Sequence, residues 1–231
     1  MGAAVIIGTG EGLSASLARK LHARGHKLVL AARNTDKLSE LQKATDAVLV
    51  ECNAVEAADM ERVFLEADKT GEPLDIAIYN PSARVRGGIT ELDPEEVKSA
   101  VLITGYGAFL MAQEAAKRML PQSSGNILFT GASAGVKGYP NSSTFAMGKF
   151  ALRGLAQSLA RELHPQGIHI GHFVIDGGIR NFNRPERIDA ADNPDSMLDP
   201  EAIAESYLHF IDQPRSSWAW EIELRPWVEK F

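Results

Sequence analysis

The stretch from residue 4 to residue 21 constrains the fold of this chain more than any other. Four apolar residues at positions 4–7 run into a turn that holds three glycines: Gly8, Gly10 and Gly12. Beyond the turn, leucines recur every fourth residue, as on one face of an amphipathic helix: Leu13, Leu17 and Leu21. The pattern predicts a β-strand, a tight turn and an α-helix in that order.

The glycine turn has the composition of an anion-binding loop. Because glycine carries no side chain, backbone N–H groups in such a turn can approach an anion closely. The helix that follows offers unpaired N–H groups and the positive end of its dipole, so a phosphate would fit there. Glycine patterns alone are weak evidence. A tight strand-to-helix turn whose glycines serve only packing is therefore the alternative interpretation.

Strand and helix patterns alternate along the rest of the chain. Further strands are expected at residues 27–32, 47–50, 74–78, 125–130, 168–175 and 218–224. Helices are expected around residues 38–41 and at 57–67, 93–119 and 145–163, with another from 199 to just before Pro214. No linker or repeat divides the 231 residues. The alternation predicts one α/β domain over residues 1–231, a Rossmann-type doubly wound parallel sheet of about seven strands with helices on both faces.

Three segments carry further expectations. The middle of the helix at 93–119 is apolar nearly all round, which predicts burial in the core or against another subunit. Residues 179–198 are dense in Asp, Asn, Arg and Pro and are expected to form a mobile loop on the substrate side. Residues 218–231 are expected to form the last strand and a C-terminal tail, which is aromatic enough to pack on the core or on a partner.

Composition excludes several classes of function. The net charge of −6 and the scattered Lys and Arg residues argue against a nucleic-acid partner. Cys52 is the single cysteine, so no intramolecular disulfide forms and a reducing compartment is favoured. No signal segment or membrane-length apolar run is expected, and the six histidines lack metal-site spacing. We expect a cytoplasmic protein with no membrane partner and no metal.

Arg33 and Asn34 follow the second expected strand, about 20 residues beyond the glycine turn, where dinucleotide folds contact the adenosine ribose. An acidic residue there would bind a free 2′-hydroxyl, whereas Arg33 favours a 2′-phosphate and hence NADP(H), with NAD(H) possible. One charge-assisted bond of about 1.5–3 kcal/mol corresponds to a preference of roughly 10- to 150-fold for NADP(H) over NAD(H). Glu11 counts against this, because a carboxylate in the turn would lie near the same phosphate, and Arg33 could also be a solvated surface charge.

Together these features resemble the short-chain dehydrogenase/reductase family, over nearly the whole chain. Residues 7–14 match its first glycine motif, with Ser14 in place of the last glycine, and residues 30–34 resemble its NADP-preferring members. Pro81 and Ser82 depart from its Asn-Asn-Ala-Gly motif, and Asp176 replaces the proline of its Pro-Gly segment. The resemblance implies these cofactor-binding residues: Gly8, Gly10, Glu11, Gly12, Leu13, Arg33, Asn34, Asn53, Ala54, Asn80, Lys149, Asp176, Gly177 and Ile179.

The resemblance breaks at the catalytic residues. Phe145 stands for the tyrosine of the family's Tyr-x-x-x-Lys motif, while Lys149 is kept. Ala132 stands for the serine that binds the substrate oxygen, and Leu102 for the asparagine that holds a relay water. In the family the tyrosine transfers a proton while hydride moves, a role typically worth about 10²- to 10⁴-fold. The ordinary tyrosine-dependent mechanism is therefore not possible, although Lys149 can still bind the cofactor ribose.

Two functional hypotheses stay open. The first is an NADP(H)-dependent oxidoreductase acting on a carbonyl, an alcohol or an activated alkene, with Ser133 or Tyr139 as candidate stand-in proton donors. A loop cap or a packed aromatic explains either residue more simply. The second is an NADP(H)-binding protein without turnover, either a sensor or a supporting subunit. The family often pairs its two long helices, here 93–119 and 145–163, so the resemblance also implies a homodimer or homotetramer.

Overall fold

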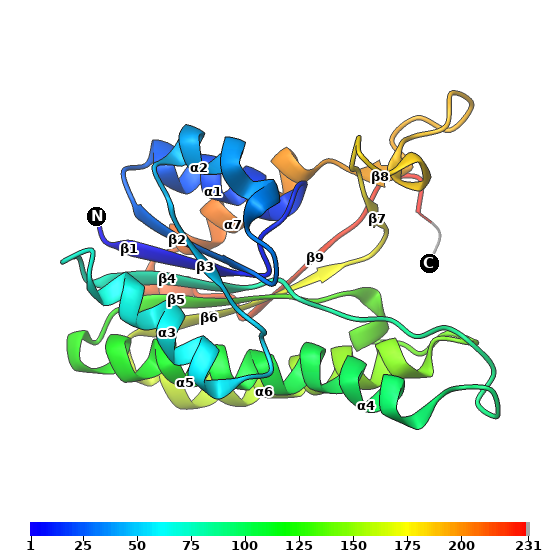
Figure 1. Ribbon diagram of the computed structural model, residues 1–231, viewed down its shortest axis with the longest axis horizontal. Helices are drawn as coiled ribbons and strands as arrows, with labels where there is room; N and C mark the ends of the chain where they lie inside the picture. The colour runs from blue at the N-terminus through cyan, green and yellow to red at the C-terminus, as the bar shows by residue number, and fades with distance from the viewer. Residues whose placement is uncertain (230–231) are drawn as a thin grey trace.

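Seven parallel strands form the centre of the structure, a computed structural model that describes residues 1–229 (Figure 1). They lie in the order β3-β2-β1-β4-β5-β6-β9. Their bounds are β1 (Ala3–Ile7), β2 (Lys27–Ala32), β3 (Val48–Glu51), β4 (Leu74–Tyr79), β5 (Gly125–Thr130), β6 (Ile168–Ile175) and β9 (Glu221–Leu224). The predicted doubly wound parallel sheet is confirmed.

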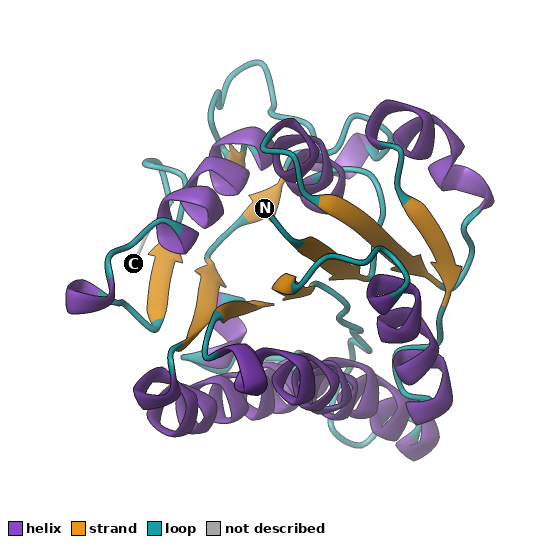
Figure 2. Cartoon of the chain, turned by 90° about the vertical axis from the view of Figure 1, so that its left-hand side faces the viewer, coloured by secondary structure: helices purple, strands orange, loops and turns teal. Residues whose placement is uncertain are grey.

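Helices cover both faces of the sheet, as the edge-on view in Figure 2 shows. One layer holds α1 (Leu13–Ala23), α2 (Ser39–Thr45) and α7 (Pro200–Ile211), and the other holds α3 (Ala57–Asp68), α5 (Gly107–Met119) and α6 (Ser143–Leu163). Successive residues of a strand point to opposite faces. Val5 accordingly packs in the core beneath α3, α5 and α6, while Ile6 packs in the core beneath α1 and α7.

The order in which the chain adds strands to the sheet reverses at β1. The strands β2 and β3 lie on one side of β1, and β4 pairs with its other side. In open parallel sheets, ligands bind in the crevice outside the carboxyl ends of the strands at such a reversal. The fold therefore places a site beyond Ile7 and Tyr79, the last residues of β1 and β4.

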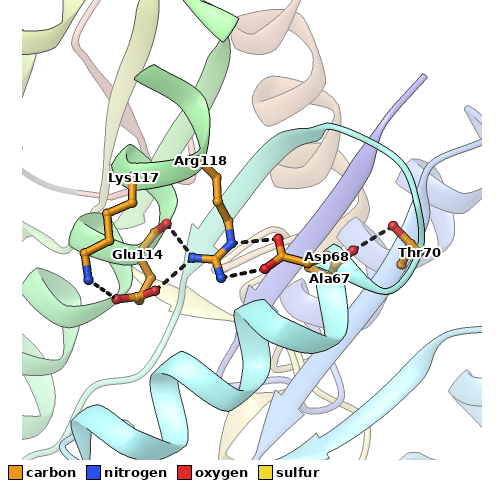
Figure 3. Close-up of polar contacts among 6 residues, drawn as sticks. All are labelled: Ala67, Asp68, Thr70, Glu114, Lys117 and Arg118. Carbon is orange, nitrogen blue, oxygen red and sulfur yellow. Dashed lines mark hydrogen bonds and ion pairs between the residues drawn. The ribbon is translucent and has the colours of Figure 1, made fainter. Parts of the chain in front are cut away.

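An ion-pair network fixes α5 against α3 in the layer below the sheet (Figure 3). Arg118 donates two hydrogen bonds, of 2.8 and 2.7 Å, to the carboxylate of Asp68 at the end of α3. The same guanidinium contacts Glu114 at 2.8 Å, and Lys117 contacts Glu114 at 2.5 Å. The Thr70 hydroxyl donates to a carbonyl in the last turn of α3. Two-pronged arginine contacts are geometrically specific, so the network sets how the two helices lie together.

The long helix expected at residues 93–119 is continuous but not uniform. It comprises α4 (Pro94–Val101), a π-helical turn at Leu102–Tyr106, and α5. Asp93 caps its start, as its carboxylate accepts from the N–H groups of Glu95 and Glu96. The Tyr79 hydroxyl donates to the carbonyl of Ile103, which compensates in part for the altered backbone pairing of a π-turn. The sequence did not predict this turn.

Only one face of this helix is buried within the chain. Ala108, Met111 and Ala115 pack in the core, as the sequence predicts. The opposite face leaves three large apolar side chains exposed to solvent: Leu102, Tyr106 and Phe109. The expected all-round burial is therefore not met by this single chain.

The last strand is shorter than expected. The prediction of a strand at 218–224 is wrong for its first residues, since β9 begins at Glu221 and residues 215–217 form a 3-10 turn. Trp218 stacks on His169 at a centroid distance of 4.4 Å, and its indole N–H donates to the carbonyl of Gln213. The alternating pattern that predicted a strand from residue 218 therefore arises, at its start, from aromatic packing and not from strand pairing.

The C-terminal tail packs only in part. Pro226 is buried, whereas Trp227 is 79% exposed and its indole N–H donates to Asp195. The expected packing therefore holds for Pro226 and fails for Trp227, because no apolar surface within residues 1–229 covers the Trp227 ring. Residues 230 and 231 of the expected tail lie outside the described residues.

The segment at residues 179–198 is tied together at its two ends. The short strands β7 (Gly178–Ile179) and β8 (Met197–Leu198) pair with each other. Within the segment, Arg180 pairs with Asp189 at 2.8 Å. It projects beyond the carboxyl ends of the main strands (Figure 1). Its mobility stays a prediction. Across residues 1–229, no helix has the length and apolar character to cross a membrane.

Candidate functional site

A cleft of about 750 Å³ opens at the carboxyl ends of β1, β2, β4 and β5. It lies at the reversal of the sheet, where a crevice is expected. The structure brings many of the predicted cofactor residues together in its lining: Gly8, Arg33, Asn34, Asn53, Ala54, Asn80, Lys149, Gly177 and Ile179. Residues far apart in the sequence thus meet in one cavity large enough for a dinucleotide with a small substrate.

The glycine turn folds as an open cradle. Gly8 and Gly12 have φ values of 79° and 92°, which favour glycine, and a Cβ on Gly8 would lie 2.6 Å from the Pro81 side chain. The N–H groups of Gly8 and Thr9 both donate to the Ala31 carbonyl. No side chain caps the start of α1, where Gly12 is the N-cap. The first N–H groups of α1 are therefore available to an anion.

Ser14 and Asn80 join the glycine turn to the end of β4. The Asn80 amide donates to the Ser14 hydroxyl at 2.6 Å, and that hydroxyl donates to the Gly8 carbonyl at 3.3 Å. The Asn80 N–H also donates to the Ile7 carbonyl at 3.1 Å. Ser14, which replaces the last glycine of the family motif, therefore holds the turn in position. Sequence analysis missed this role, although a hydroxyl in a first helical turn is a signal for it.

Two cations line the end of the cleft beyond β2. Arg33 and Lys37 are both exposed, and neither has a carboxylate partner within residues 1–229. Asn34 shapes the turn between them, because its side-chain oxygen accepts from the N–H of Asp36 at 2.9 Å. Lys37 was missed by the sequence analysis. A second basic residue four positions after Arg33 was the available signal.

Four predicted cofactor residues do not line the cleft: Gly10, Glu11, Gly12 and Leu13, all in or beside the turn. The carboxylate of Glu11 accepts from the amide of Asn183, in the segment 179–198. It is therefore engaged with that segment and does not face Arg33 across the cleft. Asp176 does not line the cleft either, because its carboxylate lies 3.6 Å from Arg225 and 3.8 Å from Lys137.

Lys149 is a buried cation at the base of the cleft. Its ammonium donates to the Thr130 carbonyl at 2.6 Å, and no carboxylate pairs with it among the described residues. Burial, together with the positive charge of Arg84, lowers its pKa to about 7. An ammonium has three N–H donors, so two remain for a ligand. The residue fits the ribose-binding role that the resemblance implies.

The positions matched to the family's tyrosine and serine line the cleft without a hydroxyl. Phe145 and Ala132 form a small buried apolar cluster with Ala134. Leu102 is exposed on the outer face of the π-turn, and its neighbour Ile103 lines the cleft instead.

The candidate stand-in donors lie elsewhere. Tyr139 donates to the Ser133 hydroxyl at 3.0 Å, and neither residue lines the cleft. Among residues 1–229, no three His, Cys, Asp or Glu side chains are grouped as a metal ion would need.

Arg84 is the most prominent side chain of the cleft that the sequence analysis missed. Its guanidinium carbon lies 3.8 Å from the centre of the Phe145 ring. Arg187, from the segment 179–198, lines the same cleft. Partial desolvation and the positive charges of Arg86 and Arg187 lower the pKa of Arg84. The available signal was a pair of arginines, Arg84 and Arg86, in the loop that follows β4.

The burial of Lys149 predicts a pH-dependent stability. Above about pH 7 the folded state holds fewer protons than the unfolded state, so the free energy of unfolding should rise with pH. We expect a slope of up to about 1.4 kcal/mol per pH unit between about pH 7, the pKa of Lys149 in the folded state, and pH 10.5, the ordinary pKa of a lysine. Lys149→Met should remove this slope and stabilise the protein by roughly 2 to 4 kcal/mol at pH 7, since a buried charge is lost.

Urea denaturation at several pH values measures both effects. Lys69→Met, which removes an exposed lysine at the end of α3, is the matched control and should change neither. The same pH dependence in the wild type and Lys149→Met would show that Lys149 is not the titrating group.

Comparisons with known proteins agree with the fold. The family model described as short chain dehydrogenase matches residues 2–181. An uncharacterized oxidoreductase of Staphylococcus aureus (strain N315) is 32% identical over 228 residues, 96% of each chain. A short-chain dehydrogenase from Rhodopseudomonas palustris is 30% identical, with a TM-score of 0.83 over 97% of this chain and 98% of its own. A metagenomic short-chain oxidoreductase in complex with NADP is 20% identical, with a TM-score of 0.82 over 99% and 98%. The chain therefore belongs to the short-chain dehydrogenase family of oxidoreductases.

Proposed function

We propose that the protein is an NADP(H)-dependent oxidoreductase that works without the family's tyrosine proton donor. The observation that carries the proposal is one cleft that is lined by two cations beyond β2, which have no carboxylate partner within residues 1–229, and by the buried ammonium of Lys149. The uncapped start of α1 follows the glycine turn whose residues Gly8 and Thr9 line the same cleft. These are the groups that a pyrophosphate, a 2′-phosphate and a ribose need. A similar fold has been solved in complex with NADP.

Each part of the cleft has a proposed role in binding the cofactor. The turn at Gly8 would hold the pyrophosphate, and Arg33 with Lys37 would hold the 2′-phosphate. Asn53 and Ala54 line the cleft where an adenine would lie. Lys149 would bond the ribose hydroxyls, and Gly177 with Ile179 would flank the nicotinamide. NADP(H) is thus preferred because two cations, and no carboxylate, line the ribose end.

The substrate end favours chemistry that does not require a positioned hydroxyl. A bound NADPH would supply the hydride. Phe145 and Ala132 present only carbon to the substrate, so the reduction of simple ketones would lack the proton donor and the polarising hydroxyl that the family places at these two positions. Arg84 and Lys149 would instead stabilise negative charge on a substrate oxygen. This arrangement suits an activated alkene conjugated to a carbonyl, whose proton can come from water after the hydride has moved.

A second candidate function is cofactor binding without turnover, as in a sensor or a supporting subunit. The specific observation in its favour is that Ser133 and Tyr139 bond to each other outside the cleft lining. No hydroxyl then replaces the missing tyrosine from that loop. The two candidates differ only in whether bound NADPH is consumed.

Titration with NADPH followed by turnover assays distinguishes these candidates. We expect saturable binding at one site per chain, followed by NADPH consumption with at least one member of a panel of ketones, aldehydes and enones. Saturable binding without consumption by any member would favour the second candidate. An absence of binding by NADPH and NADH alike would contradict both.

Cofactor preference depends on Arg33 in this proposal. Arg33→Ala should weaken NADPH binding by about 10- to 150-fold and NADH binding little, because only NADPH carries the 2′-phosphate. Lys43→Ala removes an exposed lysine of α2 that pairs with Glu40, and it is the matched control. Fluorescence titration measures the dissociation constants of the wild type and both variants for each cofactor. Equal losses for the two cofactors would refute this role for Arg33.

Restoring the missing hydroxyls tests whether the rest of the pocket is intact. Phe145→Tyr combined with Ala132→Ser should create measurable ketone reduction, since Lys149 is already in place. A gain of about 10²-fold or more over the parent is expected from a positioned donor. Steady-state assays with a ketone panel measure the gain. No gain in a folded, NADPH-binding variant would show that the pocket has diverged beyond these two positions.

We also propose that the exposed apolar face of the long helices joins two copies of the chain. Large apolar side chains on α6 and on the neighbouring helix form this apolar face: Leu102, Tyr106, Phe109, Met147 and Phe150. The π-turn packs on α6, so these side chains belong to adjacent elements. An exposed apolar patch of this kind typically marks an interface. A homodimer, or a homotetramer if a second interface is used, is the expected state.

A charge placed on the apolar face tests this oligomer. Phe150→Glu should dissociate the protein into monomers, because an unpaired carboxylate would be buried at the interface. Leu65→Glu on α3 is the matched control, since Leu65 is 47% exposed against 46% for Phe150 and lies outside the apolar face. Light scattering gives the mass of each variant. A wild-type monomer, or an unchanged Phe150→Glu oligomer, would refute the proposed interface.

The proposed location is the cytoplasm, where nicotinamide cofactors and reduced thiols are available. Cys52 is a free, buried cysteine. Burial raises the pKa of its thiol to about 11, so little reactive thiolate forms at neutral pH.

A further inference from the structure

We infer that the substrate carries a carboxylate, which Arg84 binds at the reacting end of the cleft with Arg187 as a second cation. The inference rests on the proposed function, since it names the class of substrate that the same cleft would accept. Arg84 lies beside Phe145, it has no carboxylate partner within residues 1–229, and other groups are available to the phosphates of the cofactor.

Arg84 lies at the position where the reaction would occur. Its guanidinium carbon is 3.8 Å from the centre of the Phe145 ring, and Phe145 occupies the position of the family's tyrosine. The Lys149 ammonium lies 5.8 Å from the centre of the same ring. Stacking on an aromatic face leaves the N–H edge of a guanidinium free to bind in its own plane. Arg84 therefore presents a binding edge beside the reacting atoms.

Arg84 has no anionic partner within residues 1–229. Arg86 and Arg187 are close enough to lower its pKa by their positive charges, and neither is paired with a carboxylate there. Like charges gathered in this way repel one another, and a bound anion would relieve the repulsion. The cluster therefore offers positive charge, with no carboxylate bound to it within residues 1–229, to an anion that enters the cleft.

Two carboxylates near the cleft, in the glycine turn and in the segment 179–198, are engaged with other partners. Asp189 pairs with Arg180, and Glu11 accepts from Asn183. The backbone at Arg187 is held as well, because its N–H donates to the Arg184 carbonyl and its own carbonyl accepts from the Asn181 N–H. These contacts hold Arg187 at the cleft wall and leave its guanidinium without a carboxylate.

The phosphates of the cofactor do not account for Arg84. The uncapped start of α1 serves one anion, and the cations Arg33 and Lys37 beyond β2 serve another. Arg84 comes instead from the loop after β4 and lies on Phe145, near Lys149. An anion at Arg84 is thus a different one. A planar, two-pronged guanidinium matches the geometry of a carboxylate, which points to an oxo acid or an unsaturated oxo acid.

Matched pairs of ligands that differ only in charge test the inference. Protein saturated with NADP⁺ is titrated calorimetrically with 2-oxobutanoate and its methyl ester, and with 4-oxopentanoate and its methyl ester. The oxidised cofactor prevents reduction, so the readout is binding alone. The wild type should bind at least one acid about tenfold or more tightly than its ester, as expected for a charge-assisted contact.

Two arginine variants separate the role of Arg84 from general charge. Arg84→Gln should lose the preference for the acid and keep its affinity for NADP⁺. Arg86→Gln removes the same charge two residues along the loop, at an exposed position outside the cleft lining, and should keep most of the preference.

The outcomes distinguish this inference from the proposed function. If the wild type does not bind NADP⁺, the proposed function fails first. If it binds NADP⁺ but neither acid more tightly than its ester, only the substrate class is refuted. An acid preference that survives in Arg84→Gln, with NADP⁺ binding intact, would refute the role of Arg84.

Discussion

At the carboxyl ends of the strands in a parallel sheet, some backbone carbonyl groups have no hydrogen-bond partner in the neighbouring strand. The site depends on which groups of this chain donate to those carbonyls. The Ala31 carbonyl accepts from the glycine turn, and the Ile7 carbonyl accepts from the N–H of Asn80. The Thr130 carbonyl accepts from the ammonium of Lys149. Because buried backbone groups must be paired, these contacts hold the walls of the cleft in fixed positions. The cofactor site is thus built from the same bonds that complete the fold.

The two ends of the cleft differ in chemistry. The end beside β1 and β2 offers backbone N–H groups and cations, which suit phosphates. The other end combines carbon surfaces at Phe145 and Ala132 with the positive charges of Lys149 and Arg84. Burying an unpaired ammonium costs stability. A ligand that binds Lys149 would offset this cost, which gives a physical reason for a lysine to remain where its tyrosine partner is absent.

Much of the fold could be predicted because it follows from local periodicity. The glycine turn and the alternating strands and helices specify a doubly wound sheet, and the predicted residues Asn80 and Lys149 do line its cleft. The missed features are non-local. Arg84 and Arg187 are about 100 residues apart and meet only through the folding of two loops, and the π-turn depends on the Tyr79 hydroxyl. Trp218 was misassigned to a strand because alternation also arises from aromatic stacking.

The central claim is that hydride transfer at this site is not coupled to proton transfer, because Phe145 and Ala132 offer no hydroxyl to donate a proton in the same step. Single-turnover kinetics with an unsaturated oxo acid test it most directly, using NADPH and NADPH deuterated at the transferred position, each in H₂O and in D₂O. We predict that deuteration of the cofactor slows the oxidation of NADPH, whereas D₂O leaves its rate nearly unchanged. A comparable slowing in D₂O would show that a proton moves with the hydride and would contradict the claim.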